Sequence, residues 1–229
     1  MRPRFTVLVG AVLASALVCV AGAAAATTVT VGIYRNGMET STQRAQMLQL
    51  SGRSCSRSGA EQTMVITLGK RTNQCSFRTP VIGRNLQIAA SERLLGSTPR
   101  SLQRKVYLGL FLRTGGGGGY QLVVYPTQQK VQLRKLLPGG KVKYLGIARG
   151  QRAVGGVNRT NELTLQAIDG SGGATLAGYV GGKLLLEAVD PGARELSGGA
   201  SGVMVGSTNA ATGTVASFDN VVLRVPSPF

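Results

Sequence analysis

From residue 62 to residue 225, the chain repeats one pattern: a short run in which apolar residues recur at every second position, followed by a turn rich in Gly, Asn, Pro or Asp. Alternation of this kind predicts β-strands, because successive side chains of a strand point to opposite faces. The runs are residues 62–69, 85–95, 105–114, 120–126, 129–136, 142–149, 161–169, 178–190, 201–207 and 217–225. We therefore predict an all-β fold, an antiparallel sandwich or barrel.

Two glycine-rich segments fit this scheme as turns. Residues 115–119 are five consecutive glycines between two alternating runs, which indicates the flexible tip of a hairpin. A phosphate-binding loop would require a following Lys-Ser/Thr pair and a helix, and the sequence shows neither. Gly181-Gly182 stands between apolar runs and predicts a two-residue hairpin turn.

The N-terminus has the features of a secretory signal peptide. Arg2 and Arg4 precede a long apolar stretch, residues 5–26, which ends in small residues with Ala24 and Ala26 in the A-x-A arrangement. We therefore expect a secreted or extracytoplasmic protein. The stretch is also long enough to span a bilayer, so an uncleaved membrane anchor is the competing interpretation.

Removal of the signal leaves roughly 200 residues, which suits one domain. We divide the chain into a signal peptide (1–26), an N-terminal segment (27–59) and a sandwich domain (60–229). Within the N-terminal segment, residues 27–34 are a candidate first strand. Residues 35–59 are polar and poorly patterned, and we expect a loosely ordered arm or a short helix there.

Two cysteines follow the signal, Cys55 and Cys75. In an oxidising compartment such a pair predicts one disulfide, which would tether the N-terminal arm to the domain. Two free buried thiols are the alternative. We expect no metal site and no cofactor, because the chain has no His and no C-x-x-C spacing.

The chain is strongly basic, with 26 Lys and Arg against 9 Asp and Glu. A basic surface favours polyanions: nucleic acid, acidic glycans, teichoic-type polymers or anionic membranes. Genome composition and solubility would also explain charges that are scattered rather than clustered. The densest basic run, residues 100–105, comes without a recognition-helix or RNP-like pattern, so we expect no specific nucleic-acid binding.

Alternation assigns two faces to the central strands. Apolar residues of one parity are predicted to form the core: Leu108, Leu110, Leu112, Leu122, Val124, Val131, Leu133, Leu163 and Leu165. If the strands share one sheet, the opposite face carries aromatic, arginine and glutamine side chains. The candidate ligand-binding residues are Tyr107, Phe111, Arg113, Gln121, Tyr125, Gln132, Arg134, Gln166 and Tyr179. Such a mixture suits sugars, which stack on aromatic rings and bond to amides and guanidinium groups. An ordinary solvent-facing sheet is the alternative.

The sequence lacks the catalytic residues of several enzyme classes. Without His, Ser-His and Cys-His nucleophilic systems are excluded. No predicted strand carries two acids at alternate positions, as paired-carboxylate glycoside hydrolysis on a strand would need. Glu187 and Asp190 are three residues apart, which puts them on opposite faces of a strand. We also predict no calcium site, because the acidic residues are few and scattered.

The order of the strands resembles the concanavalin A-like jelly roll, and above all the laminin-G-type and glycoside-hydrolase-16-like secreted modules of bacteria. The resemblance covers about residues 62–225 and is carried by GLFLR (109–113), YQLVV (120–124), NELTL (161–165), GYVGG (178–182) and FDNV (218–221). It implies a last strand that pairs beside the first, with Phe218 in the core and Asp219-Asn220 bonded to local backbone.

These motifs are structural, so the resemblance constrains function weakly. The lyases of this fold use a His that this chain lacks. We predict a secreted, non-catalytic module that binds a glycan or another extracellular polymer on one sheet face. The alternatives are a structural or sensory envelope domain that contacts protein partners and, with less support, a carbohydrate-active enzyme. A membrane would be contacted only through an uncleaved signal segment.

Overall fold

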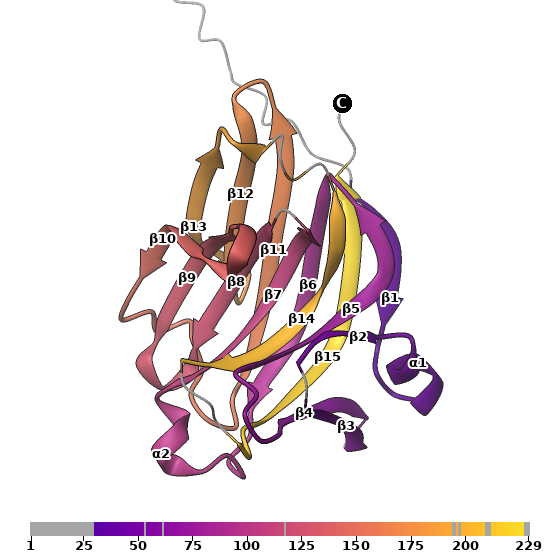
Figure 1. The fold of residues 1–229 in the computed structure, drawn as a ribbon, viewed down its shortest axis with the longest axis vertical. Helices are drawn as coiled ribbons and strands as arrows, with labels where there is room; N and C mark the ends of the chain where they lie inside the picture. Colours follow the sequence, from indigo (N-terminus) through magenta and orange to yellow (C-terminus); the bar gives the residue numbers. More distant parts are fainter. Residues whose placement is uncertain are drawn as a thin grey trace, which may run out of the picture.

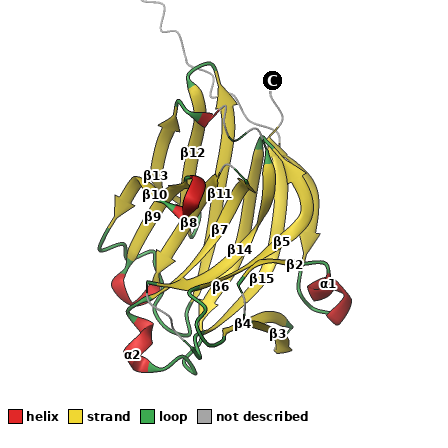
Figure 2. Cartoon of the chain, in the orientation of Figure 1, coloured by secondary structure: helices red, strands yellow, loops and turns green. Residues whose placement is uncertain are grey.

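The structure, a computed structural model, describes residues 30–226 except 53, 61, 117, 194, 195, 197 and 209–211. The predicted signal peptide therefore lies outside the described residues. Among those residues, strands make up the body of the molecule and the helices are short and peripheral (Figures 1 and 2). No helix in the described part of the chain is long and apolar enough to cross a membrane.

The elements follow one another as β1 (Thr30–Asn36), α1 (Ser41–Ala45), β2 (Leu48–Ser51), β3 (Cys55–Ala60), β4 (Thr63–Leu68), β5 (Gln74–Gly83), β6 (Leu86–Leu94), α2 (Arg100–Gln103), β7 (Val106–Gly115), β8 (Gly118–Tyr125), η1 (Pro126–Gln128), β9 (Lys130–Leu136), η2 (Pro138–Gly140), β10 (Val142–Ala148), β11 (Thr160–Gly170), β12 (Gly173–Val180), β13 (Lys183–Asp190), β14 (Gly199–Ser207) and β15 (Val215–Pro226).

The strands form two antiparallel sheets, which pack against each other as a jelly-roll sandwich. The eight-stranded sheet has the order β13-β12-β11-β6-β15-β4-β3, with β1 also paired to β15. The seven-stranded sheet has the order β10-β9-β8-β7-β14-β5-β2. The main hydrophobic core lies between the sheets and takes side chains from both. The predicted all-β sandwich is thus confirmed.

The predicted core face is confirmed as well. All nine residues assigned to the core by alternation belong to the main core cluster. The strand β6 shows the same rule in full: its residues are alternately buried and partly exposed along its whole length. Period-two patterning therefore identified the residues of β7, β8, β9 and β11 that meet the opposing sheet.

The glycine turns also lie where they were predicted. The β7–β8 hairpin falls within the glycine run, with Gly115 at the end of β7 paired to Gly118 at the start of β8. The turn between β12 and β13 consists of Gly181 (φ 57°) and Gly182 (φ 74°). Two successive positive φ angles suit the tight hairpin turns that match the twist of the strands, and glycine adopts them without strain.

The segment after β1 contributes elements to both layers. The helix α1 is a single short turn that Thr40 caps, since its hydroxyl accepts from the Gln43 backbone N–H. Farther along, β2 pairs with β5 in the seven-stranded sheet, and β3 pairs with β4 in the eight-stranded sheet. Residues 35–59, where a loosely ordered arm or a short helix was expected, thus contain the helix α1 and also the strand β2 and most of β3, which belong to the sandwich.

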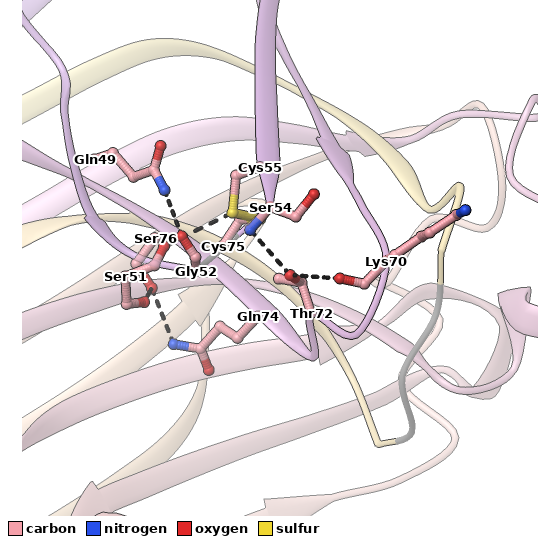
Figure 3. The surroundings of a disulfide bond; sticks show 10 residues. All are labelled: Gln49, Ser51, Gly52, Ser54, Cys55, Lys70, Thr72, Gln74, Cys75 and Ser76. Carbon is pink, nitrogen blue, oxygen red and sulfur yellow. Dashed lines mark hydrogen bonds between the residues drawn. A yellow bond between two sulfur atoms is a disulfide. The ribbon is translucent and has the colours of Figure 1, made fainter.

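The predicted disulfide is present and links the two sheets. Cys55 at the start of β3 is bonded to Cys75 in β5, with their Cα atoms 5.9 Å apart. Figure 3 shows the surrounding hydrogen bonds: Gln49 donates to the carbonyl of Gly52 at 2.6 Å, and the Ser54 N–H donates to the hydroxyl of Thr72 at 3.1 Å. The bond therefore ties an edge of one sheet to the other.

The last strand closes the eight-stranded sheet as the resemblance implied. β15 pairs with β1, β4 and β6, and the Phe218 side chain is fully buried in the core. Asp219 accepts from the N–H of Asn220 at 2.7 Å. Asn220 itself has a φ of 50°, where the pairing with β6 shifts register. The local hydrogen-bonding role of Asp219 at this bulge is thus confirmed.

Candidate functional site

The outer face of the seven-stranded sheet, which points away from the core, carries most of the candidate residues. Strand pairing arranges its side chains in three rows that run across the sheet. The first row runs from Gln74 through Gly206, Tyr107 and Tyr125 to Lys130. The second runs from Ser76 through Met204, Gly109, Val123 and Gln132 to Ile147. The third runs from Arg78 through Gly202, Phe111, Gln121 and Arg134 to Tyr144.

Glycines on β14 leave room for two of the aromatic rings. A Cβ at Gly206 would lie 2.4 Å from ring atoms of Tyr107, and one at Gly202 would lie 2.7 Å from the ring of Phe111. The rings consequently lie over the sheet backbone instead of standing away from it. Together with Val123, Tyr125, Ala200 and Met204 they form a small apolar cluster separate from the main core.

Arg134 occupies the centre of this face. Its guanidinium carbon lies 4.9 Å from the ring centroid of Tyr107 and 5.8 Å from those of Tyr125 and Tyr144, distances at which a cation is attracted by the ring face. Nη2 donates to the Tyr125 hydroxyl at 2.6 Å, and Nε donates to the Gln132 side-chain oxygen at 3.0 Å. Arg134 is only 6 % exposed. Predicted candidates from three different strands therefore meet around one guanidinium group.

Two more cations, Lys130 and Arg149, lie on this face near the Tyr125 side of Arg134. The Nζ atom of Lys130 lies 3.7 Å from the ring centroid of Tyr125. Burial lowers the pKa of Lys130, and the positive charges of Arg134 and Arg149 lower it further. Burial raises the pKa values of Tyr107 and Tyr125, and the nearby Arg134 partly offsets both shifts. The rings therefore remain neutral phenols beside a concentration of positive charge.

The exposed aromatic side chain on this face is Tyr144, which we did not predict. Tyr107, Phe111 and Tyr125 are nearly buried, whereas Tyr144 is 54 % exposed and pairs across strands with Arg134. Residues 142–149 were predicted as a strand, so the alternation there could have indicated it. Lys130 and Arg149 were also missed, although both lie within predicted runs and Lys130 has the same parity as Gln132 and Arg134.

Arg113 does not lie on the outer face, and its predicted placement with Phe111 is wrong. The register of β7 shifts between Leu112 and Gly115, and Arg113 has a φ of 54°. A bulge adds one residue to a strand and so reverses the faces of those that follow. The Arg113 side chain is fully buried, and Nη1 contacts Asp169 of the opposing sheet at 2.8 Å. Arg113 therefore forms an internal ion pair with Asp169 between the two sheets.

Gln166 and Tyr179 belong to the other sheet. Gln166 lies on β11 and Tyr179 on β12, both in the eight-stranded sheet. Alternation with the core residue Leu165 correctly turned Gln166 away from the core, but the assumption of one shared sheet was wrong. These two side chains are half-buried and face away from the remaining candidates.

The outer face of the eight-stranded sheet has a different chemistry. A hollow there is lined by Ser91, Arg93, Glu162, Ser217, Asp219 and other polar residues, without an aromatic ring. Ser91 donates to both carboxylate oxygens of Glu162, at 2.9 and 2.8 Å. Within the part of the chain that the structure describes, no group of three His, Cys, Asp or Glu side chains is placed to hold a metal ion.

The two sheets differ in their acidic residues. None of the seven strands of the seven-stranded sheet contains Asp or Glu within its bounds. The eight-stranded sheet holds most of the acids of the chain: Glu92, Glu162, Asp169, Glu187, Asp190 and Asp219. Charge that was scattered along the sequence is thus segregated in space.

Comparisons with known proteins support the fold and give no closer relative. No protein-family model matches the chain. No curated protein matches it either. Among solved structures, the Bacillus subtilis carbohydrate-binding module CBM66 aligns with a TM-score of 0.58 at 15 % identity, over 79 % of this chain and 97 % of that one.

Two further structures show the range of proteins that share the fold. A Bacillus subtilis protein of unknown function with a galectin-like fold aligns with a TM-score of 0.63 at 12 % identity, over 86 % of this chain and 98 % of that one. The alginate lyase Aly36B aligns with a TM-score of 0.53 at 13 % identity, over 87 % and 98 %. At such identities the likeness establishes the fold alone, a galectin-like jelly-roll β-sandwich, and leaves the function to be argued from the site.

Proposed function

We propose that this protein is a secreted, non-catalytic module that binds glycan on the outer face of its seven-stranded sheet. The observation that carries the proposal is the exposed Tyr144 ring beside the Arg134 guanidinium. An exposed ring offers a stacking surface for the apolar face of a sugar, and guanidinium and amide groups bond to hydroxyls. Several structural neighbours are carbohydrate-binding proteins, which is consistent with this use of the fold.

Each of the retained candidates has a role in this proposal, together with Tyr144 and Lys130. Tyr144, Arg134, Gln132 and Lys130 contact the ligand. Tyr107, Phe111, Gln121 and Tyr125 form the floor that holds Arg134 in place. The absence of Asp and Glu from these seven strands leaves the face without the carboxylate pair of a glycosidase, which supports a binding role.

The test is a matched pair of substitutions on opposite sheets. After a glycan array has identified a ligand, Tyr144→Ala should weaken its affinity by about tenfold or more, as expected of an aromatic anchor. Tyr179→Ala makes the same chemical change on the other sheet and should leave the affinity unchanged. Isothermal titration calorimetry measures both. If Tyr179→Ala weakens binding and Tyr144→Ala does not, the ligand binds to the eight-stranded sheet and the proposal is wrong.

A second candidate function rests on exposed apolar side chains at one end of the two sheets. Ile147 on β10 and Leu184 and Val189 on β13 are exposed, and these edge strands lie next to each other. Exposed apolar residues on unpaired edges suit contact with another protein. A structural or sensory envelope domain would use this edge. Leu184→Asp would then abolish partner capture while leaving glycan affinity unchanged.

A further inference from the structure

We infer that the glycan bound at this face is an acidic polysaccharide, whose carboxylate or sulfate ester docks on Arg134 on the side of Lys130 and Arg149. The inference rests on the proposed function, because it specifies the ligand class of the same face. The supporting observation is a difference in partners among the buried cations of the seven-stranded sheet.

The buried cations of the seven-stranded sheet differ in their partners. Arg113 is paired with Asp169 at 2.8 Å, and Lys135 is paired with Asp190 at 2.7 Å. Arg134 is buried to a similar extent, yet its partners are the neutral groups of Gln132 and Tyr125 and the faces of aromatic rings. A cation removed from water is costly unless an opposite charge compensates it. The inward-facing cations have that compensation within the protein, and the outward-facing one does not.

The guanidinium of Arg134 also keeps donors for a ligand. The Gln132 oxygen accepts from Nε and Nη2, and the Tyr125 hydroxyl accepts from Nη2. No acceptor among the described residues bonds to Nη1, which therefore offers two N–H groups. Guanidinium N–H groups form their strongest hydrogen bonds with carboxylate and other oxyanions.

The surrounding charge favours an anion over a neutral hydroxyl. Lys130 and Arg134 lie against the same Tyr125 ring, with Nζ 3.7 Å and the guanidinium carbon 5.8 Å from its centroid. Arg149 follows Ala148, which pairs with Val131 beside Lys130. The pKa of Lys130 is lowered chiefly by burial and further by the charges of Arg134 and Arg149. An anion bound near them relieves the repulsion between these charges. Because the seven strands hold no Asp or Glu, nothing on this face opposes that attraction.

The geometry favours a saccharide over other polyanions. Single-stranded nucleic acid is held by several exposed aromatic rings that stack successive bases. On this face Tyr144 is exposed, whereas the other three rings are nearly buried. One exposed ring beside one cationic cluster matches a sugar ring that carries an acidic substituent.

The experiment compares hexagalacturonate with its full methyl ester, which has the same backbone without the charge, by calorimetry at physiological salt. The acid should bind at least tenfold more tightly than the ester. A sulfated galactan hexasaccharide tests the sulfate ester, and a single-stranded oligonucleotide tests a phosphate backbone.

Three variants test the residues. Arg134→Lys keeps the charge and loses the planar fork of donors. Lys130→Gln/Arg149→Gln removes two charges from more exposed positions. Arg224→Gln, on the exposed outer side of β15, is the charge control.

The expected result is that Arg134→Lys and the double variant each reduce affinity for the acid at least fivefold, whereas Arg224→Gln does not. If the sulfated probe alone binds, the acidic group is a sulfate ester and the inference holds. Equal binding of acid and ester, with dependence on Tyr144, overturns the inference and preserves the proposed function. The inference is also overturned if Arg134→Lys, the double variant and Arg224→Gln lose affinity for the acid equally. Tighter binding of the oligonucleotide than of the saccharides overturns it as well. Absence of binding by every saccharide overturns both proposals.

Discussion

The Nη2 atom of Arg134 lies 2.6 Å from the hydroxyl oxygen of Tyr125, so a nearly buried cation takes a neutral phenol as a principal partner. Arg134 and Tyr125 come from adjacent strands, β9 and β8, and both side chains point away from the core. A buried charge with neutral partners contributes little to stability, because lost hydration offsets its hydrogen bonds. This arrangement is consistent with the proposed role of Arg134 in ligand binding.

Substitution of Arg134 by methionine should therefore separate stability from binding. We expect Arg134→Met to change the free energy of unfolding by no more than about 1 kcal/mol, because no carboxylate loses its partner. Affinity for an acidic glycan should fall strongly in the same variant. Urea denaturation and calorimetry measure the two quantities. A loss of several kcal/mol in stability would show that Arg134 is chiefly structural.

Lys135 provides the opposite case. Its ammonium group bonds to Asp190, which also accepts from the Tyr120 hydroxyl at 2.6 Å. Burial raises the pKa of Asp190, but the bonds from Lys135 and Tyr120 outweigh it, so the pKa is lowered overall. Lys135→Met leaves this buried carboxylate uncompensated and should cost about 3–5 kcal/mol at pH 7.

The control for Lys135 is the double variant Lys135→Met/Asp190→Asn, which should recover part of the loss because the stranded charge is gone. The contribution of the pair is present above the unfolded pKa of Asp, near 4, and is lost as pH falls through the lower folded value. Urea denaturation at pH 7 and pH 3 checks this. An equal cost of Lys135→Met at both pH values would contradict it.

The two glycines beneath the aromatic rings should respond differently to alanine. A Cβ at Gly202 would lie 2.0 Å from the carbonyl oxygen of Phe77, which is backbone and cannot move aside. At Gly206 the nearest atoms belong to the end of the Tyr107 ring, which can rotate away. We expect Gly202→Ala to cost about 3 kcal/mol or more and Gly206→Ala about 1 kcal/mol. Thermal denaturation compares them, and an equal loss would contradict the packing argument.

Glu92 should make stability depend on pH. Its carboxyl group lies fully buried on β6, and neither oxygen has a hydrogen-bond partner among the described residues. Burial raises its pKa well above the usual value, and the charge of Glu162 adds to the shift. Below about pH 4.5 the group is protonated in both folded and unfolded chains. Above it, only the unfolded chain ionises, so this group lowers the free energy of unfolding as pH rises towards the folded pKa.

Glu92→Gln removes that dependence. We expect the variant to be more stable than the wild type at pH 7, and the difference to shrink towards pH 4. Urea denaturation at several pH values measures it, with Glu187→Gln, an exposed acid on β13, as the control. A difference that stays constant from pH 4 to pH 7 would show that Glu92 is not held neutral.

The sequence by itself determined the local geometry of this protein. Alternation identified most of the strands, though not β2, β3 or β5, and the core-facing residues of β7, β8, β9 and β11. Glycine-rich segments identified two hairpin turns, and the family resemblance placed Phe218 in the core. These features follow from neighbouring residues, because the two-residue period of a strand and the φ angles of a turn are properties of the local backbone. The disulfide was predicted from a pair of cysteines and their compartment.

The tertiary structure alone decided which strands share a sheet, and with that which candidates share a face. Gln166 and Tyr179 obey the same alternation as Gln121 and Tyr125, yet strand pairing assigns them to the opposite sheet. Arg113 turned inward because a bulge shifted the register by one residue. Sheet membership and register depend on contacts between residues far apart in sequence. The separation of acids from the cationic face arises in the same way, from strand pairing, and is invisible in a chain whose charges look scattered.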